Sequence, residues 1–389
     1  MKLLSALCAP LLLATPAAPC SAFLVVGDGL VLYANNEDYS DPETRLWFVP
    51  PEEGCYGAMY LGYANRFPQG GMNEKGLCFD GFATAERLME EQEGKSPLGA
   101  RPIERAMETC ATVGEVVAFF EAYDLRPLLT HAMLQFADAS GDAVILEGDT
   151  FLRKTGDFQV VTNFYQSAQE DDLAQCPRYA AAVGVLAERE STSVEVCEEA
   201  LSAAAQRGKG VATLYSNVFD LKRRKARIYL FHDFERAVEL DLAEELAKGE
   251  RSLRLPDLFP ANVAFESFAA RNQLSLEERI AARRGPELSE AQLEAFTGAF
   301  RLELIGLPHN LSLRREGVGL VAESTTLLRS SGGSLVLHSA SADEFFAITS
   351  SGEVTLRFAR DEEGRVTGFT LLAGGRELVA ERVREEEGR

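Results

Sequence analysis

Apolar and polar positions alternate through the first part of the chain in the manner of short β-strands. Residues 22–26 and 30–33 are apolar runs on either side of Gly27-Asp28-Gly29, a pattern typical of a tight hairpin. A second turn is predicted at residues 73–76, just before another apolar run. Further runs that predict strands are residues 56–63, 77–82, 131–137, 143–147 and 158–162. This region is therefore expected to be built on antiparallel strands.

Apolar residues recur at helical spacing in later segments. Thr112 and Glu115 have the spacing of a capping box at the start of a helix. Two alanine-rich segments, residues 177–189 and 194–205, also predict helices. Strands return at residues 212–219, 226–231 and 237–240, and a short helix is predicted over 241–248. This order favours an α+β fold in which two sheets pack face to face between helical layers.

The last part of the chain has a different pattern. Residues 274–288 are charged and contain a Gly-Pro pair, which predicts a linker. A short helix is predicted over residues 289–296, and short strands then alternate with glycine-containing turns. We therefore expect a first domain over residues 20–273 and a small antiparallel β domain over residues 289–384.

The N-terminus has the composition of a secretory signal. Lys2 precedes an apolar run over residues 3–14, and small residues and prolines follow. The run is too short to span a bilayer, and no other segment reaches the roughly 18 apolar residues that a spanning helix needs. We expect residues 1–19 to be a leader that is removed, and the mature protein to be exported to the periplasm or the extracellular space.

Composition excludes several classes of function. The 389 residues, 46% of them hydrophobic and 25% charged, are ordinary for a globular protein with a sizeable core. A net charge of −21 repels phosphate backbones and anionic lipid, so neither nucleic acid nor a membrane surface is expected as a partner. Four histidines without an HExxH motif and seven scattered cysteines without a CxxC motif give no metal-ligand pattern. We expect neither a metal nor a cofactor.

Cys20 lies directly after the leader and directly before the first predicted strand. Cleavage of the Pro19–Cys20 bond would leave an α-amine, with a reference pKa of about 8, on the same residue as the thiol. That amine would take the thiol proton and later protonate the leaving nitrogen, so no histidine is needed. The alternatives are a buried structural cysteine and a lipid-acceptor cysteine, and Pro19 argues against the second.

Several segments resemble, in their order and spacing, the N-terminal-nucleophile (Ntn) amide hydrolases. This superfamily includes choloylglycine hydrolases, penicillin V acylases and acyl-CoA:6-aminopenicillanic acid acyltransferases. The resemblance covers residues 20–260 and implies a four-layer αββα sandwich that hydrolyses a linear, non-peptide carbon–nitrogen bond. The segments that carry it are Cys20-Ser21-Ala22-Phe23, Asn35-Asn36-Glu37-Asp38, residues 70–77, Val161-Thr162-Asn163 and residues 213–217.

Carried over position by position, the resemblance implies four catalytic roles. Cys20 is the nucleophile and, through its α-amine, the general base. Asp38 orients the amine and the thiol. The side-chain N–H of Asn163 points into the oxyanion hole, where a neutral fixed donor suits the developing charge. Relatives often carry an asparagine at the position of Ala83. Alanine has no side-chain donor, so the backbone N–H of Ala83 is expected to be the second oxyanion donor.

Two positions depart from the superfamily pattern. Asn35 stands where relatives have an arginine that lowers the pKa of the thiol, so Cys20 is expected to depend more on its amine. His232 falls near a second arginine of the superfamily. Both are candidate substrate-binding residues, and the alternative for His232 is a surface histidine with satisfied hydrogen bonds.

The sequence therefore predicts hydrolysis of a small-molecule N-acyl amide through a thioester on Cys20. Transfer of the acyl group to an amine is an alternative that the sequence does not separate from hydrolysis. An inactive exported binding protein on the same scaffold is another, favoured by Asn35 and Ala83. The C-terminal domain resembles β modules that follow β-lactamase-like serine hydrolases, which implies a structural or shielding role. Relatives are often homo-oligomers, so a homo-oligomer is an open expectation.

Overall fold

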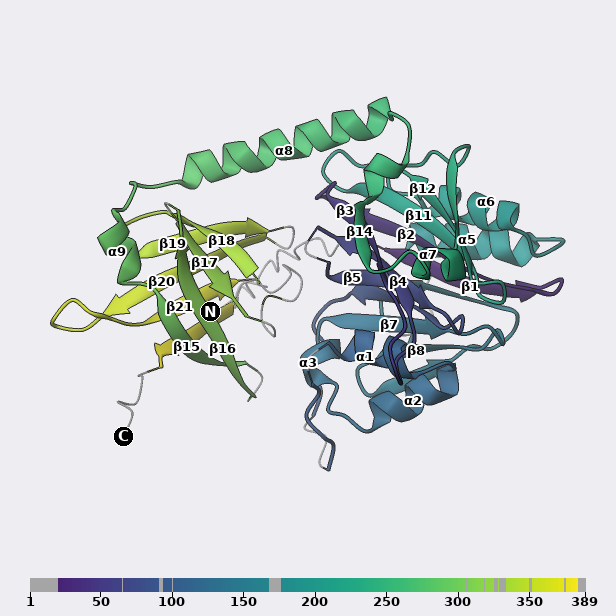
Figure 1. Ribbon diagram of the computed structural model, residues 1–389, viewed down its shortest axis with the longest axis horizontal. Coiled ribbons are helices and arrows are strands. Elements are labelled where there is room, and N and C mark those ends of the chain that lie inside the picture. The colour runs from purple at the N-terminus through teal and green to yellow at the C-terminus, as the bar shows by residue number, and fades with distance from the viewer. Residues whose placement is uncertain are drawn as a thin grey trace, which may run out of the picture.

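The protein is described by a computed structural model that consists of two units lying side by side, with a long helix running from one to the other (Figure 1). The predicted leader, residues 1–19, lies outside the described residues. The residues that the structure describes are 20–64, 66–90, 94–99, 101–167, 176–304, 307–317, 319–324, 328, 334–349, 352–373 and 376–383.

The first sheet is built around the hairpin that the sequence predicts. Strands β1 (Ser21–Gly27) and β2 (Leu30–Tyr39) are joined by Asp28 and Gly29, whose φ angles are 51° and 79°. Positive φ at both central residues is the geometry of a two-residue turn that matches the strand twist. The sheet has the order β10-β1-β2-β11-β12-β13. Its other strands are β10 (Phe158–Thr162), β11 (Ala212–Asp220), β12 (Lys225–Leu230) and β13 (Ala237–Asp241).

The second sheet is antiparallel and has the order β14-β3-β4-β5-β6-β7-β8-β9. The predicted turn between β5 and β6 is present, and Gly76 adopts a φ of 80° there. A Cβ on Gly76 would lie 2.2 Å from the carbonyl oxygen of Leu221, so the turn requires glycine. The strands are β3 (Thr44–Val49), β4 (Ala58–Tyr63), β5 (Pro68–Asn73), β6 (Cys78–Ala83), β7 (Ala132–Ala137), β8 (Ala143–Glu147), β9 (Thr150–Arg153) and β14 (Arg251–Arg254).

Three apolar clusters define four layers. The inner faces of the two sheets share one cluster, which includes Cys20, Tyr33 and Phe82. The outer face of the second sheet packs against helices α1 (Pro102–Thr109), α2 (Val113–Glu121) and α3 (Arg126–Leu129). The outer face of the first sheet packs against α5 (Pro177–Glu188) and α6 (Val194–Ala204). The predicted αββα sandwich is confirmed. The short helix α7 (Leu242–Leu246) and the 3-10 helix η1 (Leu255–Leu258) complete this unit.

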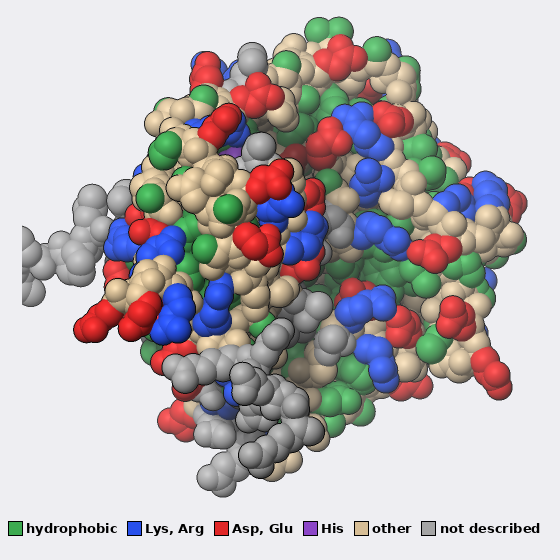
Figure 2. Space-filling model, turned by 60° about the vertical axis from the view of Figure 1, so that its left-hand side comes forward, with side chains coloured by type: hydrophobic (Ala, Val, Ile, Leu, Met, Phe, Trp, Pro, Cys, Tyr) green, Lys and Arg blue, Asp and Glu red, His purple; other side chains and the backbone are tan. Residues whose placement is uncertain are grey.

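The C-terminal strands form a closed antiparallel barrel, in which β15 pairs with β22. This confirms the expected antiparallel β domain and adds its closure, which leaves no open sheet edge. Phe300, Phe345 and Phe369 lie in its buried core beside the short helix α9 (Glu290–Glu294). The strands are β15 (Gly298–Leu304), β16 (Leu307–Glu316), β17 (Gly319–Glu323), β18 (Ser334–Ser339), β19 (Glu344–Thr349), β20 (Gly352–Arg360), β21 (Val366–Ala373) and β22 (Arg376–Arg382). Figure 2 turns the barrel side toward the viewer and shows acidic and basic side chains interspersed over this face.

Helix α8 (Val263–Arg283) is fixed to both units. Near its start, Phe265 and Phe268 pack against Phe231 of the sandwich, with ring centroids 5.8 and 5.2 Å from that of Phe231. At its end, Arg283 pairs with Glu344 of the barrel at 2.7 Å. The segment expected as a linker, residues 274–288, therefore begins inside this helix. Its first ten residues contain neither glycine nor proline, so nothing in them stops the helix.

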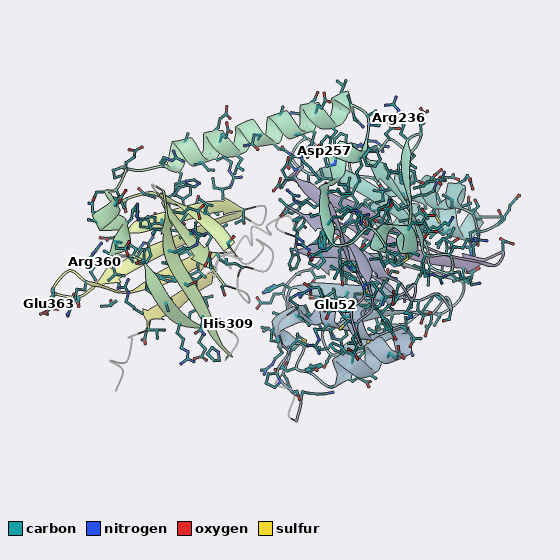
Figure 3. All side chains as sticks on the ribbon, in the orientation of Figure 1. Glu52, Arg236, Asp257, His309, Arg360 and Glu363 are labelled. Atoms are coloured by element: carbon teal, nitrogen blue, oxygen red, sulfur yellow. The ribbon has the colours of Figure 1, made fainter. Side chains whose placement is uncertain are left out.

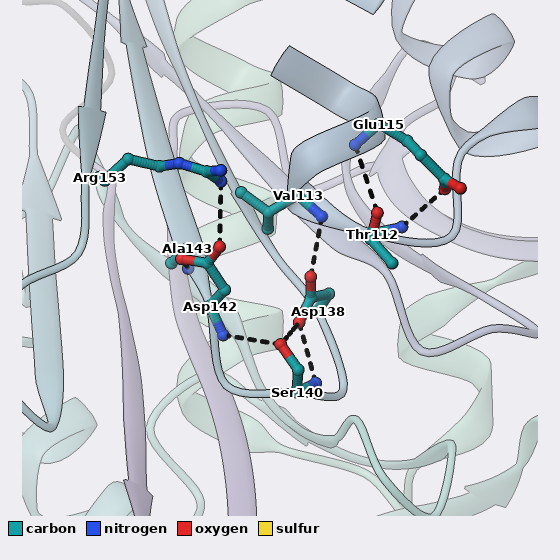
Figure 4. A network of polar contacts seen from close by, with 8 residues as sticks. All are labelled: Thr112, Val113, Glu115, Asp138, Ser140, Asp142, Ala143 and Arg153. Carbon is teal, nitrogen blue, oxygen red and sulfur yellow. Dashed lines mark hydrogen bonds and ion pairs between the residues drawn. The ribbon is translucent and has the colours of Figure 1, made fainter. Parts of the chain in front are cut away.

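The buried carboxylate of Asp138, in the turn between β7 and β8, is hydrogen-bonded to the start of helix α2 (Figure 4). Asp138 is 3% exposed, and its Oδ2 accepts a hydrogen bond of 2.8 Å from the N–H of Val113, the first residue of α2. Its Oδ1 accepts from the N–H of Ser140 at 2.8 Å. The predicted capping box of Thr112 and Glu115 is present at the same helix start. A negative charge here also opposes the positive end of the helix dipole.

Asp138→Ala should lower the free energy of unfolding by about 1.5–3 kcal/mol, because it leaves buried N–H groups without their charged acceptor. Asp142→Asn, in the same turn, weakens an exposed pair with Arg153 while its amide oxygen can still accept from the Ala143 N–H, and should cost only about 0.2–1 kcal/mol. Urea denaturation of both variants measures the difference. Equal losses would contradict the role given to Asp138.

Candidate active site

Cys20 lies at the entrance to β1 with its side chain between the two sheets, and it is 2% exposed. Its thiol is hydrogen-bonded to the backbone N–H of Asp38 and to the carboxyl group of Glu37. In the full-length chain the nitrogen of Cys20 is part of the peptide bond to Pro19. The α-amine of the predicted mechanism therefore forms only when that bond is cut.

The surroundings of Cys20 keep the thiol protonated. Burial raises its pKa most, and the negative charges of Glu37, Asp38 and Asp80 raise it further. The N–H of Asp38 acts in the opposite direction but is the smallest influence. A nucleophile in this setting needs a base that removes its proton during the reaction.

Asp38 lies beside Cys20 at the end of β2. Its side chain is fully buried, and the hydroxyl of Thr213 donates to its Oδ1. Burial raises the pKa of Asp38 to about 7, while the Thr213 hydrogen bond and the charge of Arg178 lower it.

Arg178 is a site residue that the sequence analysis missed. It lies in the first turn of α5, and its Nη1 donates to the Ser21 hydroxyl at 2.8 Å and to the carbonyl oxygen of Cys20. Its Nη2 donates to the Oδ1 of Asn163 at 3.2 Å. One guanidinium thus ties the main chain of Cys20 to Asn163, the predicted oxyanion residue. Its position in an alanine-rich helix gave no sign of this role, because the contact joins residues far apart in the sequence.

The structure brings the two predicted oxyanion donors together. The Nδ2 of Asn163 donates to the carbonyl oxygen of Ala83 at 2.8 Å, which joins the end of β10 to the end of β6. The neighbouring contact between Thr84 and Tyr165, with 2.8 Å between their hydroxyl oxygens, strengthens this junction. Asn163 is therefore held at both ends of its amide, by Ala83 and by Arg178.

The two candidate substrate-binding residues lie in different places. Asn35 is 1% exposed on β2, and its Nδ2 has no hydrogen-bond partner among the described residues. His232 is half-buried, and its ring Nε2 lies 2.8 Å from the carbonyl oxygen of Gln206. Burial lowers the pKa of His232. The structure shows no contact between the His232 ring and Cys20 within the described residues.

Two buried carboxyl groups complete the surroundings of the thiol, and the sequence analysis gave neither of them a role. Glu37 on β2 and Asp80 on β6 are 0% and 2% exposed. Burial is the largest cause that raises the pKa of each, and repulsion raises both further, from Asp38 on Glu37 and from Glu37 on Asp80. Glu37 shares one face of β2 with Tyr33 and Asn35, because side chains alternate along a strand. A charged residue at a core-facing position was the sign available in the sequence.

A cleft of about 410 Å³ lies beside this group, between the sandwich, α8 and the barrel. Tyr39 and Tyr63 form its wall on the sandwich side, with ring centroids 4.2 Å apart. The hydroxyl of Tyr63 donates to the Oε1 of Glu37 at 3.4 Å, so one tyrosine separates the cleft from the acid. Val336 of the barrel lines the opposite side and is 56% exposed.

Other kinds of site receive no support within the described ranges. No group of three or more His, Cys, Asp or Glu side chains there is arranged to hold a metal ion. None of the six described cysteines forms a disulfide with another described cysteine. His309 lies on the barrel (Figure 3). In the same part of the chain, no helix has both the length and the apolar character needed to cross a membrane.

Comparison with known proteins gives structural neighbours only. No family model and no curated protein matches the chain. A penicillin V acylase from Agrobacterium tumefaciens is 17% identical, with 61% of this chain and 92% of that chain covered and a TM-score of 0.47. Two variants of a conjugated bile acid hydrolase from Clostridium perfringens are 15% and 14% identical, with TM-scores of 0.47 and 0.49. In both comparisons 62% of this chain and 97% of the hydrolase chain are covered. These are the kinds of hydrolase that the N-terminal motifs resemble.

Asp80→Asn should stabilise the protein at alkaline pH. The folded state raises the pKa of Asp80 above its ordinary value, so the folded protein binds this proton more tightly than the unfolded chain does. The wild type therefore loses stability as the pH rises from the ordinary carboxyl range toward the raised pKa, by about 1.4 kcal/mol per pH unit. The variant, which has no such proton, escapes this loss.

Urea denaturation of wild type and variant at pH 5 and pH 9 measures the effect, with the exposed Asp142→Asn as control. The advantage of Asp80→Asn should appear at pH 9 and shrink at pH 5. An advantage confined to pH 5 would contradict the assignment.

Proposed function

We propose that the mature protein hydrolyses a small N-acyl amide in the periplasm or the extracellular space, with Cys20 as its nucleophile. The observation that carries the proposal is the position of the Cys20 thiol. It belongs to the first residue after the predicted leader, lies at the start of a central strand, and is bonded to the Asp38 N–H. The motifs of the N-terminal half point to the same chemistry.

The proposed reaction has two stages. The thiol proton passes to the α-amine of Cys20, the sulfur attacks the carbonyl carbon, and the carbonyl oxygen becomes an oxyanion. The carbon–nitrogen bond then breaks, the ammonium group gives its proton to the leaving nitrogen, and a thioester remains. Water attacks the thioester, which releases a carboxylic acid and restores the thiol.

The α-amine of Cys20 supplies the base that the buried thiol needs. A thiol surrounded by three carboxyl groups does not ionise unaided, because burial and their charges both raise its pKa. An amine on the same residue is held within reach of the thiol, and Asp38 stabilises its protonated form. Burial of Asp38 keeps this interaction strong, because water does not screen it.

Asn163 and Ala83 supply the oxyanion donors in this proposal. The Asn163 amide turns from the Ala83 carbonyl to the substrate oxygen, and the N–H of Ala83 joins it. Arg178 holds the carbonyl end of the Asn163 side chain at 3.2 Å, which limits the directions in which the amide can turn. A donor that is positioned before the reaction stabilises the oxyanion more than one that must be ordered.

Cys20→Ala should lower the turnover of N-acyl 4-nitroanilides by at least about 1,000-fold, because the nucleophile is lost. The matched control is Cys197→Ala, a cysteine that is equally buried but lies between the first sheet and α6. Release of 4-nitroaniline measures turnover, and circular dichroism checks the fold. Turnover that survives in Cys20→Ala would remove the proposed nucleophile.

The mature chain should begin at Cys20. Intact mass and N-terminal sequencing of protein from an exporting host measure this directly, and thiol alkylation before digestion shows which cysteine reacts. A chain that starts at another residue, or a lipid on Cys20, leaves no free α-amine and would refute the mechanism.

A further inference from the structure

Several buried polar atoms between the two sheets lack hydrogen-bond partners within the described residues. The residues that carry them are at most 2% exposed. Such groups are rare in folded proteins, because each one loses its hydration without replacement. The atoms are the Oε2 of Glu37, the Oδ1 of Asp80, the hydroxyl of Tyr33 and the Nδ2 atoms of Asn35 and Asn217.

Four of these residues surround one place. Tyr33, Asn35 and Glu37 alternate along β2 and face the second sheet. Asp80 faces them from β6, where its charge acts on both Tyr33 and Glu37. Tyr215 of β11 is close enough to interact with Glu37, Asp80 and Cys20. We call the site formed by Tyr33, Glu37, Asp80 and Tyr215 the inner acidic site.

The inner acidic site gathers carboxyl groups that no side-chain cation of the described residues neutralises. No lysine or arginine in the described ranges forms an ion pair with Glu37 or Asp80. Arg178 approaches from the α5 layer, on the other side of the first sheet, and contacts the main chain of Cys20. A Cβ on Gly70 would lie 3.0 Å from the Oδ2 of Asp80, so the close approach of this carboxyl group to β5 depends on glycine.

We propose that the inner acidic site binds a primary ammonium group of the substrate, so that the preferred substrates are aminoacyl amides. An ammonium group has three N–H donors, which match the unpartnered oxygens of Glu37, Asp80 and Tyr33. The faces of the surrounding tyrosines also attract a cation. This inference rests on the proposed function of Cys20 and specifies its substrate class.

The position of Glu37 limits where the ammonium group lies on the substrate. Its carboxyl group is hydrogen-bonded to the Cys20 thiol, so a cation bound to Glu37 is close to the carbon that the sulfur attacks. An amino group on the acyl part, one or two carbons from the scissile carbonyl, fits this spacing. The net charge of −21 favours the approach of such cationic substrates.

The bound ammonium group would also activate the nucleophile. When Glu37 and Asp80 are ionised, their charges raise the pKa of the thiol, and a cation between them offsets this effect. The thiol then ionises more readily with an aminoacyl substrate in place than in the empty site. The preference for such substrates should therefore appear in kcat as well as in KM.

The test compares two amides of the same shape. L-alanine 4-nitroanilide carries an ammonium group where isobutyric acid 4-nitroanilide carries a methyl group. The wild type should show at least a 10-fold higher kcat/KM for the alanyl compound. Glu37→Gln and Asp80→Asn should each reduce that ratio by at least 10-fold. Glu52→Gln, an exposed carboxyl on the sandwich (Figure 3), should leave it unchanged.

Binding to Cys20→Ala is measured separately by calorimetry, so that the inference does not depend on turnover. At least 10-fold tighter binding of the alanyl compound supports the inner acidic site even where neither amide is hydrolysed, an outcome that would count only against the role of Cys20. Equal binding of the two compounds overturns the inference. Glu37→Gln that slows both amides equally, with their ratio kept, also overturns it, because Glu37 would then act on the thiol alone.

Discussion

Ionisable side chains packed between two sheets without a neutralising cation are the constraint on which the rest of this site depends. The thiol of Cys20 and the carboxyl groups of Glu37 and Asp80 lose their hydration there, and each negative charge makes the next one harder to form. The resting site therefore holds its protons. In our proposals, the thiol ionises only when a positive group can pair with the negative charge that forms. The α-amine of Cys20 and the ammonium group of the substrate are the two such groups.

The positively charged side chain of the site, Arg178, lies on the helical side of the first sheet, opposite the thiol. Along β2, Asn36 faces the helices and donates to the Leu201 carbonyl at 2.8 Å, whereas Glu37 faces the second sheet. Arg178 comes from the helical side, where it holds the Cys20 carbonyl and acts on Asp38. This separation lets an arginine position the nucleophile's main chain without neutralising the acids that surround its thiol.

Local signals predicted the fold well, and contacts distant in sequence account for what they missed. The hairpin at Gly27, the capping box at Thr112 and the α5 helix each depend on neighbouring residues, so the sequence shows them. β5 was not predicted, because its sequence PQGGMN has little β propensity and depends on its neighbours for order. At the site, Cys20 and Asp38 lie on two strands joined by a predicted hairpin, whereas Arg178 and Asp80 come from elements whose approach no spacing reveals.

Access to the thiol follows from the same arrangement. Cys20 is 2% exposed, and the stacked pair Tyr39–Tyr63 stands between Glu37 and the cleft against the barrel. Helix α8 contacts the sandwich through Phe268 and the barrel through Arg283, and barrel residues line the far side of that cleft. On the proposed function, the cleft limits the size of what reaches the tyrosines, and the acids behind them select its charge. In this proposal, the cleft selects substrates by shape and the inner acidic site selects them by charge, so only a substrate that fits both reaches the Cys20 thiol.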